Sequence, residues 1–89
     1  MAVRTVPVAA SVGLHARPAS LFVQEVMATG LPVTIACGDR GPVDGRSMLG
    51  VMTLGARHGE EVTLTADGEG AEEALDRLVE FLSRDLDSE

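Results

Sequence analysis

The sequence is poor in aromatic residues, in cysteine and in lysine, and these shortages exclude several classes of protein. Its 89 residues include two Phe, no Trp and no Tyr, and all seven basic residues are Arg. With 14 acidic residues, the formal net charge is −7. A chain without excess positive charge or aromatic stacking groups lacks the two features by which proteins typically bind nucleic acids. We therefore expect no nucleic-acid partner.

The single cysteine and the lack of long apolar runs indicate the compartment. Cys37 cannot form an internal disulfide, which fits a reducing environment. Residues 1–12 contain a charge and a proline and do not resemble a signal peptide. No apolar run approaches the ~20 residues that span a membrane. We expect a cytoplasmic monomer without membrane insertion, in which residues 1–89 form a single domain.

Charge is unevenly distributed along the chain. Residues 1–59 hold five arginines against three acids, a net charge of +2. Residues 60–89 hold eleven acids against two arginines, a net charge of −9. This asymmetry predicts a neutral or mildly basic working face and an acidic surface behind it.

The hydrophobic pattern predicts seven short elements in the order βαββαβα. Alternating apolar residues indicate strands, and apolar spacings of three or four residues indicate helices. The expected strands are Val3–Val8, Leu31–Cys37, Pro42–Asp44 and Glu61–Ala66, and the expected helices run from Ala16 to a Gly30 cap, from Met48 to Leu54 and from Ala71 to Leu86, with Arg84 near the last helix end. Pro7 removes a hydrogen-bond donor, so the first strand is expected at a sheet edge. We predict an α+β fold, an open-faced two-layer sandwich whose four-stranded antiparallel sheet carries three helices on one face.

The first predicted helix has a constrained start. Pro18 is tolerated only in a first helical turn, because proline lacks an N–H and clashes with a preceding turn. The helix must therefore begin just after His15. Its apolar side is expected to contain Ala19, Phe22 or Val23, Val26 and Met27.

The stretch Gly-Leu-His-Ala-Arg-Pro-Ala at 13–19 carries the clearest chemical signal. A histidine immediately before a helix lies beside backbone N–H groups without helical acceptors and at the positive end of the helix dipole. This field disfavours the imidazolium ion and favours an anion attached to the ring of His15. Arg17 can add charge-assisted hydrogen bonds to phosphate oxygens. The combination suits a reversible phosphoryl carrier, although most histidines before helices with a nearby arginine are ordinary helix ends.

Two separated motifs resemble one protein family. They are the stretch at 13–19 and Gly-Arg-Ser-Met-Leu-Gly-Val-Met-Thr-Leu-Gly at 45–55. Both resemble HPr, the histidine-containing phosphocarrier family of the bacterial phosphoenolpyruvate-dependent sugar phosphotransferase system. The resemblance implies that phospho-enzyme I phosphorylates Nδ1 of His15, that enzyme IIA components receive the group, and that Arg17 stabilises it in transit. Such a protein is a carrier, not an enzyme, and uses neither a cofactor nor a metal.

Ser47 admits two interpretations. It stands where a helix N-cap is expected, and that role alone stabilises a helix by ~1 kcal/mol. The resemblance implies that it is also a regulatory serine, which a serine kinase phosphorylates and a phosphorylase dephosphorylates. The phosphate would affect docking to partners, including a transcriptional regulator. The sequence leaves both interpretations open.

The resemblance also implies a docking surface beside His15. Its expected members are Ser20, Leu21, Gln24, Met48, Leu49 and Met52. A helix of two turns cannot bury apolar residues on every side, and flexible thioethers suit a surface that accepts several partners. The alternative for the apolar residues of this short helix is that all are core, which is the expectation for Val51 and Leu54. Ser20, Leu21 and Gln24 could equally be ordinary helix surface.

Other functions and sites are weaker alternatives. A regulatory phosphocarrier of the nitrogen-related branch, acting by docking to regulators, would also retain His15 and stays open. An independent enzyme with His15 as general base lacks a carboxylate to orient the ring and an evident pocket. His58 is expected to be solvated and Cys37 buried, and a metal held by both histidines would lack a third ligand.

Overall fold

The computed structural model describes residues 1–10 and 13–84 and contains four strands and three helices. The strands are β1 (Ala2–Pro7), β2 (Val33–Cys37), β3 (Arg40–Asp44) and β4 (Glu61–Ala66), and the helices are α1 (Ala16–Thr29), α2 (Met48–Thr53) and α3 (Ala71–Leu82). Their order is the predicted βαββαβα, and the sheet order is β1-β4-β2-β3 with antiparallel pairing throughout. Strand β1 lies at an edge, as Pro7 predicts.

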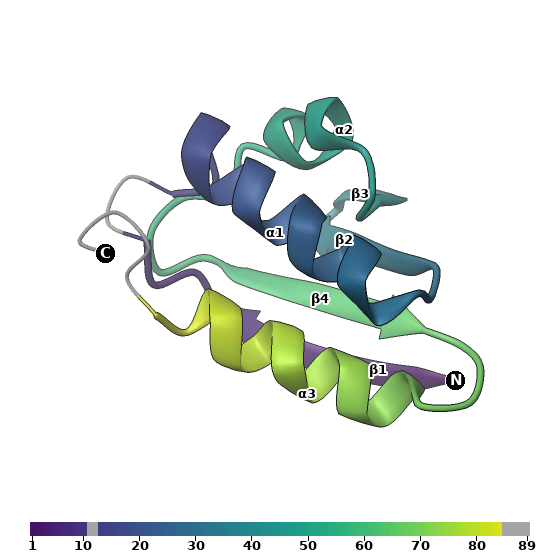
Figure 1. Ribbon diagram of the computed structural model, residues 1–89. Coiled ribbons are helices and arrows are strands. Elements are labelled where there is room, and N and C mark those ends of the chain that lie inside the picture. Colours follow the sequence, from purple (N-terminus) through teal and green to yellow (C-terminus); the bar gives the residue numbers. More distant parts are fainter. Residues whose placement is uncertain (11–12, 85–89) are drawn as a thin grey trace.

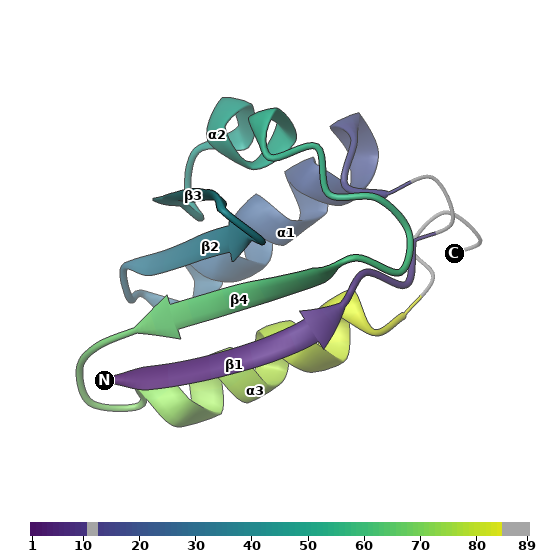
Figure 2. The ribbon, with the colours of Figure 1, turned by 180° about the vertical axis from the view of Figure 1, so that it is seen from behind.

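The sheet is covered by helices on one face and open on the other. Helices α1 and α3 lie against the sheet, and α2 packs against α1 and β3 (Figure 1). The view from behind shows the uncovered face, with α1 and α3 beyond the strands (Figure 2). The predicted open-faced two-layer sandwich is confirmed.

Alternation along β4 explains how the sheet separates core from solvent. Val62, Leu64 and Ala66 are buried, whereas Thr63 and Thr65 between them face the open side and are half-buried. Successive side chains of a strand point to opposite faces, so the helices need only one apolar face to cover. No polar or charged side chain is buried in the described part of the chain.

Several strand boundaries differ from the expected ones by one or two residues. Strand β2 begins at Val33 instead of Leu31, because Pro32 has no N–H and the N–H of Leu31 bonds to Oγ1 of Thr29 at 3.2 Å. Strand β1 is shifted by one residue toward the N-terminus, and β3 begins two residues earlier than expected, at Arg40.

Helix α3 ends four residues earlier than the apolar spacing suggested. Its last residue is Leu82, and Ser83 caps it. Arg84 therefore lies beyond the helix, with its guanidinium carbon 5.6 Å from the centre of the Phe81 ring, a cation–π distance. The spacing had extended to Leu86, which lies outside the described residues.

Met27 was wrongly expected on the apolar side of α1. Its exposed fraction is 60%, whereas Phe22 and Val26 are fully buried. Each residue turns 100° around a helix, so the residue after Val26 has left the buried face. Of the two alternatives expected on this side, Phe22 is buried and Val23 is only half-buried, so Phe22 is the one that packs in the core.

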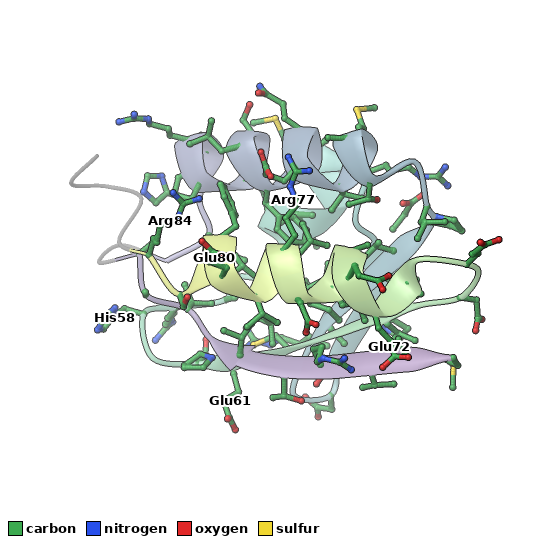
Figure 3. All side chains as sticks on the ribbon, turned by 60° about the horizontal axis from the view of Figure 1, so that its bottom comes forward. His58, Glu61, Glu72, Arg77, Glu80 and Arg84 are labelled. Atoms are coloured by element: carbon green, nitrogen blue, oxygen red, sulfur yellow. The ribbon has the colours of Figure 1, made fainter. Side chains whose placement is uncertain are left out.

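The packing predicts that Leu75→Ala lowers the free energy of unfolding by about 2–5 kcal/mol, because it leaves a cavity under α3. Leu75 is fully buried, whereas Glu80 lies on the exposed side of the same helix (Figure 3). The matched variant Glu80→Ala should change stability by less than about 0.5 kcal/mol. Urea denaturation of both variants measures the difference, and equal small losses would contradict this description of the core.

Candidate functional site

His15 occupies the N-cap position of α1. Its backbone is extended, with φ −94° and ψ −159°, and its carbonyl accepts a hydrogen bond from the N–H of Ala19 at 2.9 Å. The imidazole makes no capping hydrogen bond, and the residue is exposed together with Ala16 and Arg17. The predicted helix start is confirmed, and His15 is exposed at the positive end of α1.

The residues before His15 are held by the loop that follows α2. The N–H of Leu14 donates to the carbonyl of Ala56 at 2.9 Å, and the Leu14 side chain is buried. Gly13 has φ +78°, and a Cβ at this position would lie 2.5 Å from the Ala56 oxygen and 3.0 Å from Cα of Arg57. Two backbones therefore meet at a distance that only glycine permits. Sequence reasoning missed this support, and the only local hint was the glycine two residues before His15.

The predicted residues of α1 extend along one side of the helix. Arg17 and Gln24 are seven residues apart and share an exposed side, and Ser20 and Leu21 between them are half-buried. The geometry brings these four residues together on one surface of α1.

Helix α2 carries the predicted apolar surface. The exposed fraction is 40% for Met48, 77% for Leu49 and 38% for Met52. Val51 and Leu54 are buried, as expected. Because α2 packs against α1, this surface belongs to the helix that adjoins the one beginning at His15 (Figure 1).

Ser47 is the N-cap of α2, as predicted. Its Oγ accepts a hydrogen bond from the N–H of Gly50 at 3.0 Å. The turn before it is closed by Asp44, whose Oδ1 accepts from the backbone N–H of Arg46 at 2.9 Å and from its Nε at 3.2 Å. The hydrogen bonds from Arg46, chiefly those of its side chain, lower the pKa of Asp44. The cap is therefore built on a fixed turn.

The two other candidate residues are placed as expected. Cys37 is a free, buried thiol, and its Sγ accepts a hydrogen bond from Nη2 of Arg40 at 3.1 Å. His58 is exposed and points away from the molecule (Figure 3). Residues 1–10 and 13–84 contain no group of three or more His, Cys, Asp or Glu side chains arranged to hold a metal ion. Nor does a helix in these residues have the length and apolarity needed for a bilayer crossing.

Charge separation between the two parts of the chain is weaker than their net charges suggest. Arg4 of β1 pairs with Asp76 of α3 at 2.9 Å, and Arg40 pairs with Glu60 at 3.0 Å. Two arginines from residues 1–59 therefore neutralise acids from residues 60–89. Glu72 of α3 also lies 3.5 Å from Arg4, whereas Glu80 is exposed on the same helix (Figure 3).

Comparisons with known proteins agree over nearly the whole chain. A family profile described as "PTS HPr component phosphorylation site" matches residues 2–84. The phosphocarrier protein HPr of Streptomyces coelicolor is 54% identical over 87 residues, covering 98% of this chain and 94% of that protein. The HPr-like protein Crh of Bacillus subtilis is 38% identical, covering 97% of this chain and 100% of that protein. The crystal structure of HPr-C-His from Thermoanaerobacter tengcongensis matches with a TM-score of 0.84 at 36% identity, covering 92% of this chain and 91% of that one.

The close contact at Gly13 predicts that Gly13→Ala destabilises the protein more than Gly59→Ala does. Both glycines have positive φ, at +78° and +85°, so both variants bear the ~1–2 kcal/mol cost of a left-handed alanine. An added Cβ would have neighbours within 4 Å at Gly13 but none at Gly59. The resulting overlap in Gly13→Ala should cost about 1–3 kcal/mol more. Urea denaturation gives both values. Equal losses would contradict the tight contact between Gly13 and Ala56.

Proposed function

The chain belongs to the HPr family of phosphocarrier proteins, and on this premise we propose that its His15 accepts a phosphoryl group from enzyme I and passes it to enzyme IIA components of sugar permeases. The observation that supports this role is the exposed position of His15 at the N-terminus of α1, with Arg17 two residues further on. The protein then acts as a carrier through a transient phosphohistidine, and not as an enzyme.

Each transfer, from the donor to His15 and from His15 to the acceptor, forms one bond to phosphorus and breaks another. A ring nitrogen of His15, which we propose to be Nδ1, forms a bond to phosphorus while the bond from phosphorus to the donor breaks and its electron pair returns to the donor. The first-turn amides of α1 and the guanidinium of Arg17 stabilise the negative oxygens of the phosphoryl group. Because catalysis of this kind is mostly positioning and charge stabilisation, the two protein surfaces supply it together.

Partner docking is proposed for the apolar surface of α2 and the adjoining side of α1. Leu49 is 77% exposed, and Met48 and Met52 flank it on the same short helix. An apolar patch of this kind is the core that a protein interface buries, and methionine side chains adapt to differently shaped partners. On α1, the proposed contacts are Ser20, Leu21 and Gln24.

A regulatory role is the second candidate. Ser47 caps the helix that carries the docking surface, so a phosphate on its Oγ would place about two negative charges beside Met48. That charge would repel one set of partners or attract another, such as a transcriptional regulator, under the control of a serine kinase and phosphorylase. A nitrogen-related carrier that docks to regulators would use the same His15.

Phosphoryl transfer is tested by incubating the protein with labelled phosphoenolpyruvate and enzyme I. The wild type should acquire an acid-labile, alkali-stable label, because phosphohistidine has that stability. His15→Ala should acquire none, whereas His58→Ala, which removes the other histidine, should be labelled as the wild type is. Arg17→Ala should slow labelling by about 10²-fold, because it removes a charged donor to the transferred group. An unlabelled wild type would refute the proposal.

The role of Ser47 is tested in cells and in the purified protein. Ser47→Ala should lower the free energy of unfolding by ~1 kcal/mol, because the hydroxyl no longer accepts from Gly50. If Ser47 is also a switch, the wild-type protein from cells carries an acid-stable phosphate, which Ser47→Ala abolishes and Ser20→Ala leaves unchanged. A stability loss with no such phosphate under any growth condition would leave the cap as its only role.

A further inference from the structure

The loop between α2 and β4, residues 55–60, supports the chain that leads into His15. In addition to the hydrogen bond from Leu14 to Ala56, the N–H of Val8 donates to the carbonyl of Glu60 at 2.9 Å. The N–H of Gly59 donates back to the carbonyl of Val8 at 2.8 Å. The position of this loop therefore determines where the residues just before His15 lie.

Arg40 of β3 holds the same loop from the sheet. Its Nη1 donates to the carbonyl of Gly55 at 3.4 Å, and its Nη2 donates to Oε2 of Glu60 at 3.0 Å. The same nitrogen contacts Sγ of Cys37 on β2 at 3.1 Å. A guanidinium is planar and rigid, so these contacts fix the start and the end of the loop relative to two strands at once.

Glu60 closes the loop on itself. Its Oε1 accepts from the backbone N–H of Arg57 at 2.8 Å, while its Oε2 accepts from Arg40. The hydrogen bond from Arg57 is the main cause that lowers the pKa of Glu60, and the bond to Glu60 raises the pKa of Arg40. One carboxylate thus joins the loop backbone to β3.

These contacts are too exposed to matter chiefly for stability. The side chains of Arg40 and Glu60 are 44% and 40% exposed, and pairs of that kind typically contribute little to the free energy of folding. Their contribution is geometric. Arg40 and Glu60 fix Gly55 and Arg57, which flank Ala56, and the carbonyl of Ala56 receives Leu14 immediately before His15.

We propose that Arg40 and Glu60 are positioning residues for phosphoryl transfer, which hold the Ala56 carbonyl and through it the orientation of the His15 ring. This inference rests on the carrier function proposed above. The ring must meet a phosphoryl group presented by another protein, and misplacement by ~1 Å can cost about 10²-fold in rate. The two side chains that position His15, Arg40 on β3 and Glu60 just before β4, lie far from it in the sequence.

Another ion pair supplies a matched control. Arg4 and Asp76 are 2.9 Å apart and join β1 to α3, and the other ion-pair partner of Arg4, Glu72, also lies on α3 and not in residues 55–60. Asp76→Asn and Glu60→Gln each convert a carboxylate paired with arginine into an amide. A general effect of losing an ion pair would appear in both variants, whereas a positioning effect should appear only in Glu60→Gln.

The experiment measures kcat and KM for phosphoryl acceptance from phospho-enzyme I, with the carrier as the varied substrate. Glu60→Gln and Arg40→Gln should each lower kcat by about tenfold, because both loosen the same support. The double variant should lose less than the sum of the two single losses, since the two residues belong to one hydrogen-bond network. Asp76→Asn should match the wild type.

Two readouts separate positioning from other roles. If Arg40 and Glu60 acted as docking charges, removing charges of opposite sign would move KM in opposite directions, and that result would overturn the inference. Amide exchange at Leu14 should accelerate in Glu60→Gln and Arg40→Gln while β4 amides stay protected, because the hydrogen bond to Ala56 is released.

The outcomes also distinguish this inference from the proposed function. An unlabelled wild type would refute the carrier role, and both claims about transfer would fail with it. A labelled wild type with unchanged kcat in Glu60→Gln and Arg40→Gln would refute only the positioning role. Unchanged Leu14 exchange, or an equal loss of kcat in Asp76→Asn, would refute it as well.

Discussion

The arrangement of the site depends on one backbone hydrogen bond, from the N–H of Leu14 to the carbonyl of Ala56. It joins the chain entering α1 to the loop leaving α2, and it forms because Gly13 has no side chain to separate the two backbones. Immediately after this contact, His15 takes an extended conformation and α1 begins. The exposed ring thus stands at the end of a helix whose base is fixed to the sheet through residues 55–60.

The sheet explains why such a small protein can hold an exposed site in place. Strand β4 pairs with β1 and β2, so the loop before it leads directly into an inner strand of the sheet. Buried apolar residues on α1, α3 and the covered face form one core, and the described part of the chain buries no charged side chain. The surface of α1 and α2 thereby stays exposed, as the proposed docking of partners requires, and its apolar character comes from residues that a two-turn helix cannot bury.

Local signals predicted much of the fold and the candidate site. Pro18 required the helix to begin after His15, Ser47 indicated the start of α2, and Gly30 is the left-handed C-cap that was expected. Such features depend on neighbours within one helical turn, so the sequence displays them directly.

The features that sequence reasoning missed depend on contacts between distant segments. Nothing near His15 indicates that Ala56 receives the preceding amide, nor does any local pattern pair Arg40 with Glu60. The pairing of Arg4 with Asp76 weakened the predicted charge separation for the same reason. Met27 was misplaced because apolarity alone does not tell which residue at the edge of a helical stripe is buried.

The central claim is that the phosphoryl group resides on His15 at the N-terminus of α1. Nuclear magnetic resonance of the ¹⁵N-labelled, phosphorylated protein tests it most directly, through the coupling between phosphorus and a ring nitrogen. The account predicts coupling to Nδ1 of His15, together with a large shift of the Ala16 amide, because that amide lies at the helix end beside the added charge. Coupling to a nitrogen of His58, or phosphorylation that leaves the first turn of α1 unshifted, would contradict it.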